Sequence, residues 1–268
     1  AIKKGKGLII TMTDPPFLIF WSAVLLKKHK WAYWSMDLYP EAFEAANLAH
    51  KNTFLYNFFK RAVLRNPPHF LISLGRLQYD FLTKDYNREI PGVALPCGIY
   101  EMNDNSAQMP QWRTDTSKIY YGYCGNLGEA HSQQFVEQVI KQLDPRKHRF
   151  ILSVYGAKAK ALEEFAAKYA VVQKVPSVAR HQLSFIDVHL VTLQKNWNHI
   201  CVPSKAVTAV CTGSPILFCG TTDNDNWAYL EHAGWFIDET KALDTQVRHI
   251  LSKITPETVF GKDALLTR

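Results

Sequence analysis

The chain has 268 residues, of which 47% are hydrophobic, and its formal net charge is +7. This composition is that of a globular protein with one large or two modest domains, which excludes an intrinsically disordered chain. The excess of basic residues suits a negatively charged partner.

The first part of the chain alternates short apolar runs with helical patterns, which favours a parallel sheet covered by helices. Strands are predicted at residues 8–12, 31–36, 70–74 and 93–96, helices at 17–26 and 76–84, and a mainly helical segment at 42–64. Asp37 follows the second strand. Its carboxylate could cap the next helix or act as a general base. The polar stretch at residues 102–116 is interpreted as a linker.

The apolar helix predicted at residues 17–26 is flanked by lysines and tryptophans, among them Lys27, Lys28 and Trp31. It is too short to span a bilayer, for which about 20 apolar residues are needed. Two interpretations stay open: a buried helix with solvated charges at its end, or peripheral contact with an anionic membrane surface. Nucleic acid is not expected as a partner, because no helix-turn-helix, zinc or aromatic RNA-binding pattern is present.

The second part of the chain continues the alternation. Strands are predicted at residues 118–124, 148–155, 171–175, 188–193 and 215–220, and helices at 132–143, 158–169, 179–184, 204–212 and 227–233.

Two turns in this second part are suited to a phosphate or diphosphate. One helix opens at Pro203 and Ser204 and carries Lys205 at its N-terminus, where unpaired amides and an ammonium attract anions. The turn at residues 125–128 also presents backbone amides between a strand and a helix. Each turn is also compatible with a purely structural role, and the glycines do not match the dinucleotide-binding fingerprint. Together the two turns favour a nucleotide crevice.

The order of these motifs resembles that of GT-B glycosyltransferases, in particular glycosyltransferase family 4 and its bacterial members that build exopolysaccharide or cell-surface glycans. The resemblance covers nearly the whole chain; its motifs lie at residues 9–16, 37–41, 70–74, 95–99, 125–131, 187–193, 202–215 and 226–237. It implies an α/β fold of two Rossmann-like domains whose parallel sheets face a cleft. Residues 1–113 would form a partial acceptor-binding domain with linker, and residues 114–268 the donor-binding domain. The first domain is expected to be incomplete, as in a fragment or a minimal member.

The resemblance further implies a site for a nucleotide sugar, expected to be a UDP-hexose, with no metal or other cofactor. The donor-binding residues it implies are Gly125, Asn126, Gly128, His131, Val175, Ser204, Lys205, Thr208, Asp225, Asn226 and Trp227. Val175 would read the base through its backbone, Thr208 would bind the ribose, and Asp37 is the candidate catalytic residue. The sequence departs from the family pattern in two respects. Asn126 and His131 replace the two usual diphosphate cations, and Ile200 and Thr208 stand where paired glutamates would fall.

Asp223, Asn224 and Asp225 resemble the metal-binding Asp-x-Asp motif of the other glycosyltransferase fold, GT-A. The tripeptide follows a predicted strand and precedes a predicted helix, so Asn224 or Asp225 is interpreted as a helix N-cap rather than a metal ligand.

The function predicted from the sequence is retaining transfer of a hexose onto a glycan or lipid-linked acceptor, in polysaccharide biosynthesis. Five cysteines without a CxxC pair indicate reduced thiols and hence the cytoplasm, with peripheral attachment to the inner face of the membrane if the basic region contacts lipid. Two alternatives stay open: a non-catalytic nucleotide-sugar-binding module or subunit, and a GT-B nucleotide-sugar epimerase.

Overall fold

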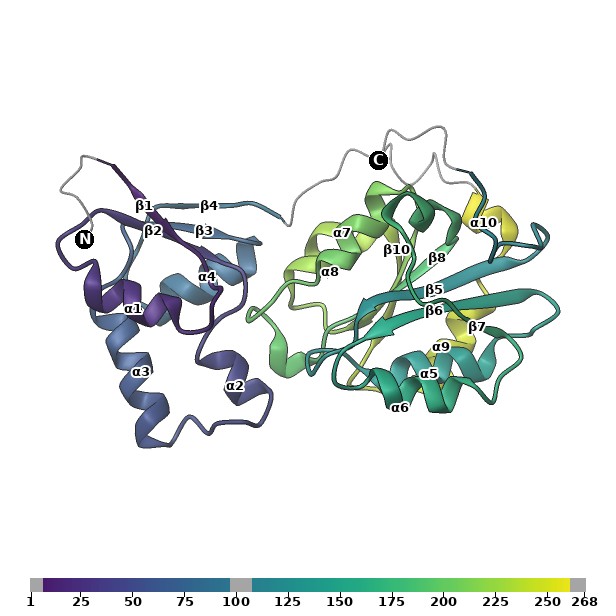
Figure 1. Cartoon of the computed structure of the whole chain (residues 1–268), viewed down its shortest axis with the longest axis horizontal. Coiled ribbons are helices and arrows are strands. Elements are labelled where there is room, and N and C mark those ends of the chain that lie inside the picture. The colour runs from purple at the N-terminus through teal and green to yellow at the C-terminus, as the bar shows by residue number, and fades with distance from the viewer. Residues whose placement is uncertain (1–6, 97–107, 261–268) are drawn as a thin grey trace. The chain divides into compact units, whose positions relative to one another are not determined.

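The computed structural model describes residues 7–96 and 108–260. The chain divides into two compact units, one formed by Ala1–Cys97 with Trp197–Val202 and the other by Gly98–Asn196 with Pro203–Arg268 (Figure 1). The linker predicted at residues 102–116 falls within the second unit, and its first six positions lie outside the described residues.

The first unit contains a four-stranded parallel sheet in the order β1-β2-β3-β4. The strands are β1 (Ile9–Thr11), β2 (Trp31–Ser35), β3 (Phe70–Ser73) and β4 (Gly92–Ala94), and the helices are α1 (Leu18–Leu25), α2 (Glu41–Ala45), α3 (Phe54–Arg65) and α4 (Arg76–Asp85). Because the strand order follows the chain, right-handed crossovers place the connecting helices on one face of the sheet. The core lies on that face, where Ile19 and Ala23 of α1 pack with Trp31, Tyr33 and Leu71.

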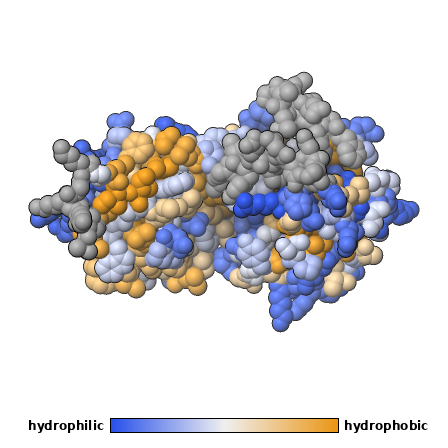
Figure 2. All heavy atoms as spheres, turned by 45° about the horizontal axis from the view of Figure 1, so that its top comes forward, coloured by the Kyte–Doolittle hydropathy of each residue, from blue (hydrophilic) through white to orange (hydrophobic). Residues whose placement is uncertain are grey.

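The opposite face of this sheet carries no helix among the described residues (Figure 1). Hydrophobic side chains gather on the first unit in the view of Figure 2. Exposed apolar residues of the edge strands and their flanks are Leu8, Ile10, Met12, Val93 and Leu95. An open apolar face of this kind is unusual for a parallel sheet, which is normally covered on both sides.

The segment predicted to be mainly helical, residues 42–64, forms the two helices α2 and α3. Asn47, just beyond the end of α2, has a φ of 57°, a left-handed conformation that interrupts the helix. The next helix, α3, has its own N-cap at Thr53, whose hydroxyl accepts a hydrogen bond from the Tyr56 N–H at 3.4 Å.

A buried ion cluster joins these two helices to α4. The ammonium of Lys60 contacts the carboxylates of Glu41 and Asp85. Burial by itself lowers the pKa of Lys60, but the two carboxylates outweigh it and hold the pKa above its ordinary value.

The second unit contains a six-stranded parallel sheet in the order β10-β9-β8-β5-β6-β7. Its strands are β5 (Ile119–Asn126), β6 (His148–Tyr155), β7 (Val172–Lys174), β8 (Val188–Thr192), β9 (Ile216–Gly220) and β10 (Gly234–Asp238). Its helices are α5 (Gln133–Gln142), α6 (Ala159–Ala166), α7 (Ser204–Cys211), α8 (Asp225–Leu230), α9 (Leu243–Leu251) and α10 (Pro256–Phe260), and the 3₁₀ helices are η1 (Arg180–Phe185), η2 (Lys195–Trp197) and η3 (Glu231–Ala233). The parallel sheets and the alternation confirm the α/β prediction; β10, α9 and α10 were not predicted from the sequence.

The segment Trp197–Val202 leaves the second unit and packs in the first. Ile200 is 8% exposed within the first hydrophobic core, and its carbonyl accepts a hydrogen bond from the Leu38 N–H at 3.0 Å. In the described part of the chain, no helix is both long enough and apolar enough to cross a bilayer.

Candidate functional site

The second sheet reverses its strand order between β5 and β8. From β5 the chain winds outward through β6 and β7, and from β8 it winds the other way through β9 and β10. Ligands of open α/β sheets bind at such a switch point, outside the carboxyl ends of the strands. All the donor-binding residues predicted from the sequence lie in this unit: at the end of β5, in the loops after β5 and β7, or in α7 and α8.

The turn after β5 is shaped by glycines. Gly125 has a φ of +117°, which favours glycine, and nothing lies within 4 Å of the position that a Cβ would occupy there. Gly156, at the end of β6, has a φ of +107° and lies under the Asn126 side chain, where a Cβ would have no room. A Cβ on Gly128 would meet Asn126 Nδ2 at 3.2 Å. The turn therefore leaves open space at Gly125 and packs tightly behind Asn126.

Lys205 reaches from the first turn of α7 to this glycine turn. Its Nζ donates to the Tyr123 hydroxyl at 2.6 Å and to the Asn126 carbonyl at 2.8 Å, and lies 4.1 Å from the centre of the Tyr123 ring. An ammonium has three donors, so these two bonds leave one for a ligand. Desolvation lowers the pKa of Lys205 to about 7. The lysine predicted to bind a diphosphate and the turn at residues 125–128 thus form one cluster.

His131 joins the same cluster as a neutral group. It is 8% exposed, and its Nδ1 lies 2.6 Å from the Thr192 carbonyl oxygen at the end of β8. Burial and the nearby charge of Lys205 lower its pKa to about 3. Because a carbonyl only accepts, Nδ1 carries the proton and Nε2 is an acceptor. His131 therefore supplies no positive charge here, although it occupies the place of a cation in the family pattern.

Ser204, Thr208 and Val175, which were also predicted from the sequence, belong to the second unit as well. Ser204 begins α7 with an exposed side chain, and no side chain caps this helix, so its first amides are open to a ligand. The Thr208 hydroxyl donates to the Ser204 carbonyl at 3.1 Å, and its oxygen can still accept a bond. The Val175 N–H is already donated to the Leu152 carbonyl at 2.9 Å. A nucleotide base that binds at Val175 would therefore form a hydrogen bond with the Val175 carbonyl rather than with its N–H.

Asn224 is the N-cap of α8, as one of the two sequence interpretations predicted. Its side-chain oxygen accepts the Trp227 N–H at 3.1 Å. The described residues contain no group of three or more His, Cys, Asp or Glu side chains that could hold a metal ion. Asp225 is 2% exposed, and the Trp227 ring packs against Phe236 at a centroid distance of 4.8 Å.

Asn226, in the first turn of α8, has an unusual environment. Its side chain is 2% exposed, yet neither its carboxamide nitrogen nor its oxygen has a hydrogen-bond partner among the described residues. An unpaired buried polar group is costly, so a bound ligand is a physical reason for keeping it.

Asp37 lies in the first unit, directly after β2, with an exposed side chain. Partial desolvation by the surrounding protein raises its pKa. The N-cap of α2 is Pro40, and no side chain caps that helix. The structure therefore does not support the capping interpretation of Asp37.

Two side chains of this candidate site were not predicted from the sequence. Tyr123 is buried inside β5 and holds Lys205, a pairing across 82 positions that no local pattern reveals. Lys158 donates to the carbonyls of Glu129 and His131, at 3.0 and 2.9 Å, and so fixes the loop that carries His131. The sequence feature that could have identified Lys158 is a second strand–glycine–helix turn, at Gly156, which repeats the arrangement at Gly125.

The chain is similar to known glycosyltransferases. It is 23% identical over 231 residues to the probable glycosyltransferase WbjE of Pseudomonas aeruginosa, a match that covers 79% of this chain and 57% of that protein. Its fold matches WaaG, a glycosyltransferase involved in lipopolysaccharide biosynthesis, with a TM-score of 0.65 and 18% identity over 87% of this chain and 69% of WaaG. It also matches the pneumococcal O-GlcNAc transferase GtfA, solved with UDP and GlcNAc, with a TM-score of 0.58 and 14% identity over 97% of this chain and 57% of GtfA. No family model matches.

These similarities confirm the fold predicted from the sequence. The chain has the GT-B fold of glycosyltransferases, built from two α/β units on parallel sheets, of which the first has four strands in the described residues. It spans about half the length of the curated relative, 57% of WbjE.

Proposed function

We propose that the chain acts as a glycosyltransferase that moves a hexose from a UDP-sugar onto a glycan or lipid-linked acceptor. The observation that carries this proposal is the cluster of Lys205 and the glycine turn at the switch point of the second sheet. Similarity to WbjE and to the fold of WaaG supports the same class of activity.

The donor would bind with its diphosphate between the start of α7 and the turn after β5. The open amides of α7, the space beside Gly125 and the third donor of Lys205 all suit an anion with several oxygens. As the bond to the sugar breaks, negative charge grows on this diphosphate, and the fixed amides and the ammonium would stabilise it. We propose that these amides and the ammonium stabilise the diphosphate without a metal ion.

The other predicted residues would orient the rest of the donor. The acceptor nitrogen of neutral His131 and the unpaired carboxamide of Asn226 suit sugar hydroxyls, which both donate and accept. Thr208 would bind the ribose and the Val175 carbonyl the base. A uridine donor is supported by the presence of UDP in the solved structure of GtfA. Membership of family 4 and retention of the anomeric configuration are proposals that rest on the order of the sequence motifs.

Asp37 is proposed to act on the acceptor. A carboxylate with a raised pKa is a better general base than an ordinary one, because its proton affinity is closer to that needed near neutral pH. The acceptor would be a glycan or a lipid-linked sugar, used in the cytoplasm or at the inner face of the membrane.

Calorimetry with UDP, GDP, ADP and dTDP tests the donor, and a transfer assay with the matching nucleotide sugars tests the reaction. We expect UDP to bind and Lys205→Ala to lose most of that affinity, whereas Lys160→Ala, which changes an exposed lysine of α6, serves as control. Unchanged UDP affinity in Lys205→Ala would remove the proposed diphosphate site. Binding without transfer or hydrolysis, across a full acceptor panel, would favour the alternative of a non-catalytic binding module.

A further inference from the structure

The first unit carries a second apolar surface, formed by the helices α1 and α3. On α1, Trp21 and Leu25 lie one turn apart and are 55% and 65% exposed. On α3, Phe54 and Phe58 are also one turn apart and are 85% and 51% exposed. Phe20 links the two rows, because its ring lies 5.1 Å from that of Trp21 and 6.0 Å from that of Phe58. We call this surface the α1–α3 face.

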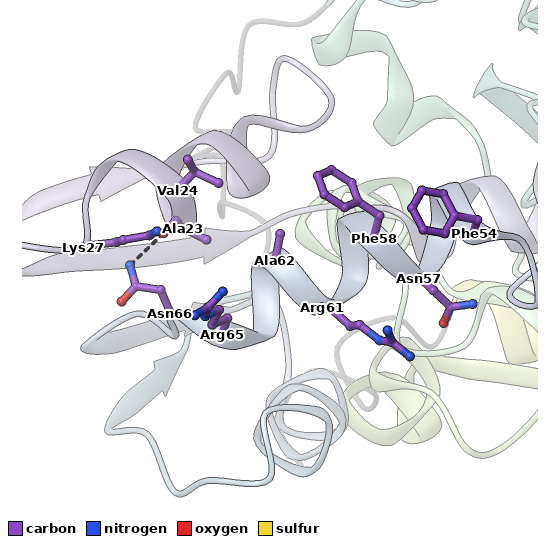
Figure 3. Close-up of a pocket in the computed structure, with 10 residues that line it drawn as sticks. All are labelled: Ala23, Val24, Lys27, Phe54, Asn57, Phe58, Arg61, Ala62, Arg65 and Asn66. Atoms are coloured by element: carbon purple, nitrogen blue, oxygen red, sulfur yellow. Dashed lines mark hydrogen bonds between the residues drawn. The ribbon is translucent and has the colours of Figure 1, made fainter.

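Basic side chains run beside the apolar row. Arg61 and Arg65 follow Asn57 at a spacing of four along α3. At about 100° per residue, each of the two arginines lies within about 60° of Phe54 and Phe58 around the helix. Figure 3 shows the two phenylalanines on one side of α3 and Arg61 on the other. Lys27 follows the end of α1, next to the exposed Lys28. In the part of the chain that the structure describes, none of these four cations forms an ion pair with a carboxylate.

A groove of about 330 Å³ lies between the two helices. Its apolar lining comes from Ala23, Val24, Phe54, Phe58 and Ala62. Its polar lining consists of the cations Lys27, Arg61 and Arg65 with Asn57 and Asn66, and no carboxylate lines it. The carboxamide nitrogen of Asn66 donates to the Ala23 carbonyl at 2.9 Å, which ties the end of α3 to α1 and fixes the shape of the groove (Figure 3).

We propose that the α1–α3 face docks on an anionic lipid bilayer, with the groove holding the phosphate of an acidic lipid beside its acyl chain. Aromatic and aliphatic side chains on one stripe with basic ones on the next are the arrangement of a helix that lies in a membrane interface. Charge selects this partner over a second copy of the chain. Two copies that met through this face would bring like charges together, and the whole chain carries a net charge of +7. The docking residues all lie in the first unit, so this proposal and the proposed donor site can fail independently.

The proposal is tested by flotation of the protein with vesicles of phosphatidylcholine alone and of phosphatidylcholine mixed with phosphatidylglycerol. We expect binding only to the mixed vesicles, weakened by salt because the Debye length shrinks. Arg61→Gln with Arg65→Gln should weaken binding about fivefold per residue, which corresponds to about 1 kcal/mol each. Phe54→Ser with Phe58→Ser should weaken it about tenfold, because these rings would no longer be buried in lipid.

Two matched variants of the same unit serve as controls. Lys84→Gln with Arg88→Gln removes two exposed charges near the end of α4, and Ile10→Ser with Val93→Ser removes two exposed apolar side chains from the uncovered sheet face. Both should bind the mixed vesicles as the unchanged protein does. The circular dichroism spectrum and the urea unfolding midpoint, measured in each variant, report whether the first unit is still folded.

Three results would overturn the proposal. The first is equal binding to neutral and anionic vesicles, and the second is binding that survives the phenylalanine pair or the arginine pair. The third is an absence of vesicle binding accompanied by self-association that the phenylalanine pair abolishes, which would make the face an interface between copies. Quenching of Trp21 by brominated lipid, lost in Trp21→Phe, would place the exposed end of α1 in the bilayer.

Discussion

The lowered pKa of Lys205 should make nucleotide binding depend on pH near neutrality. Desolvation lowers its pKa to about 7, whereas a bound diphosphate restores a counter-charge and would raise the pKa again. Only the protonated lysine attracts the diphosphate as a cation. UDP binding should therefore be accompanied by proton uptake, and the affinity should fall as the pH rises through the pKa of the free protein.

The size of the effect follows from the titration of one group. At about pH 7 roughly half of the lysines are protonated, and at about pH 8.5 roughly 3% are, so the affinity should fall about fifteenfold over this interval. The range lies above the second pKa of a phosphate, about 6, which keeps the charge of the ligand nearly constant. Calorimetry in buffers with different ionisation enthalpies should find uptake of about half a proton near pH 7.

Lys205→Arg is the matched control, because a guanidinium stays protonated throughout this range. Its UDP affinity should be nearly independent of pH, even if geometry lowers the affinity overall. If the unchanged protein showed the same pH-independent affinity as Lys205→Arg, or if no proton were taken up on binding, Lys205 would not be the titrating group that binds the diphosphate.

Three further predictions concern other buried or reacting groups. Asn226→Leu should lower the affinity for the UDP-sugar about tenfold and raise stability by about 1 kcal/mol in urea unfolding, because the unpaired carboxamide is lost; lower stability with unchanged affinity would make Asn226 a structural residue. Lys60→Met should lower stability by about 1–3 kcal/mol, because the buried Glu41 and the partly buried Asp85 lose their cation, and Glu41→Gln with Asp85→Asn in that background should restore much of it; an unchanged unfolding midpoint would contradict this. Asp37→Asn should slow transfer about 10²–10⁴-fold and leave UDP affinity unchanged, and the activity of the unchanged protein should fall as the pH drops through the raised pKa of Asp37; full activity in the variant would exclude it as the base.

The sequence predicted most of the fold, because apolar periodicity and the placement of glycine and proline decide where strands and helices lie. The prediction of a mainly helical segment at residues 42–64 was confirmed. The break between α2 and α3 was not foreseen, because the left-handed Asn47 and the cap at Thr53 are local signals weaker than the helical pattern around them. The segment Trp197–Val202 could not be assigned to the first unit either. The apolar character of Ile200 suits either core, and only the fold decides which one it enters.

The candidate site was predictable where chemistry is local and obscure where it depends on distant contacts. The turn at residues 125–128 and the start of α7 were found from the sequence, because glycines and a helix N-terminus are read from adjacent residues. Tyr123 was not, because its role arises from a lysine 82 positions away. The charge state of His131 also depends on burial and on the Thr192 carbonyl, neither of which the sequence displays.

A structure of the protein determined with bound UDP would show directly whether Lys205 and the glycine turn hold the diphosphate. The β-phosphate should lie within hydrogen-bonding distance of Lys205 Nζ and of the backbone amides at residues 125–128 or at the start of α7. A diphosphate bound away from the carboxyl edge of the second sheet, or held there by a metal ion with Lys205 still paired only to Tyr123 and Asn126, would contradict it.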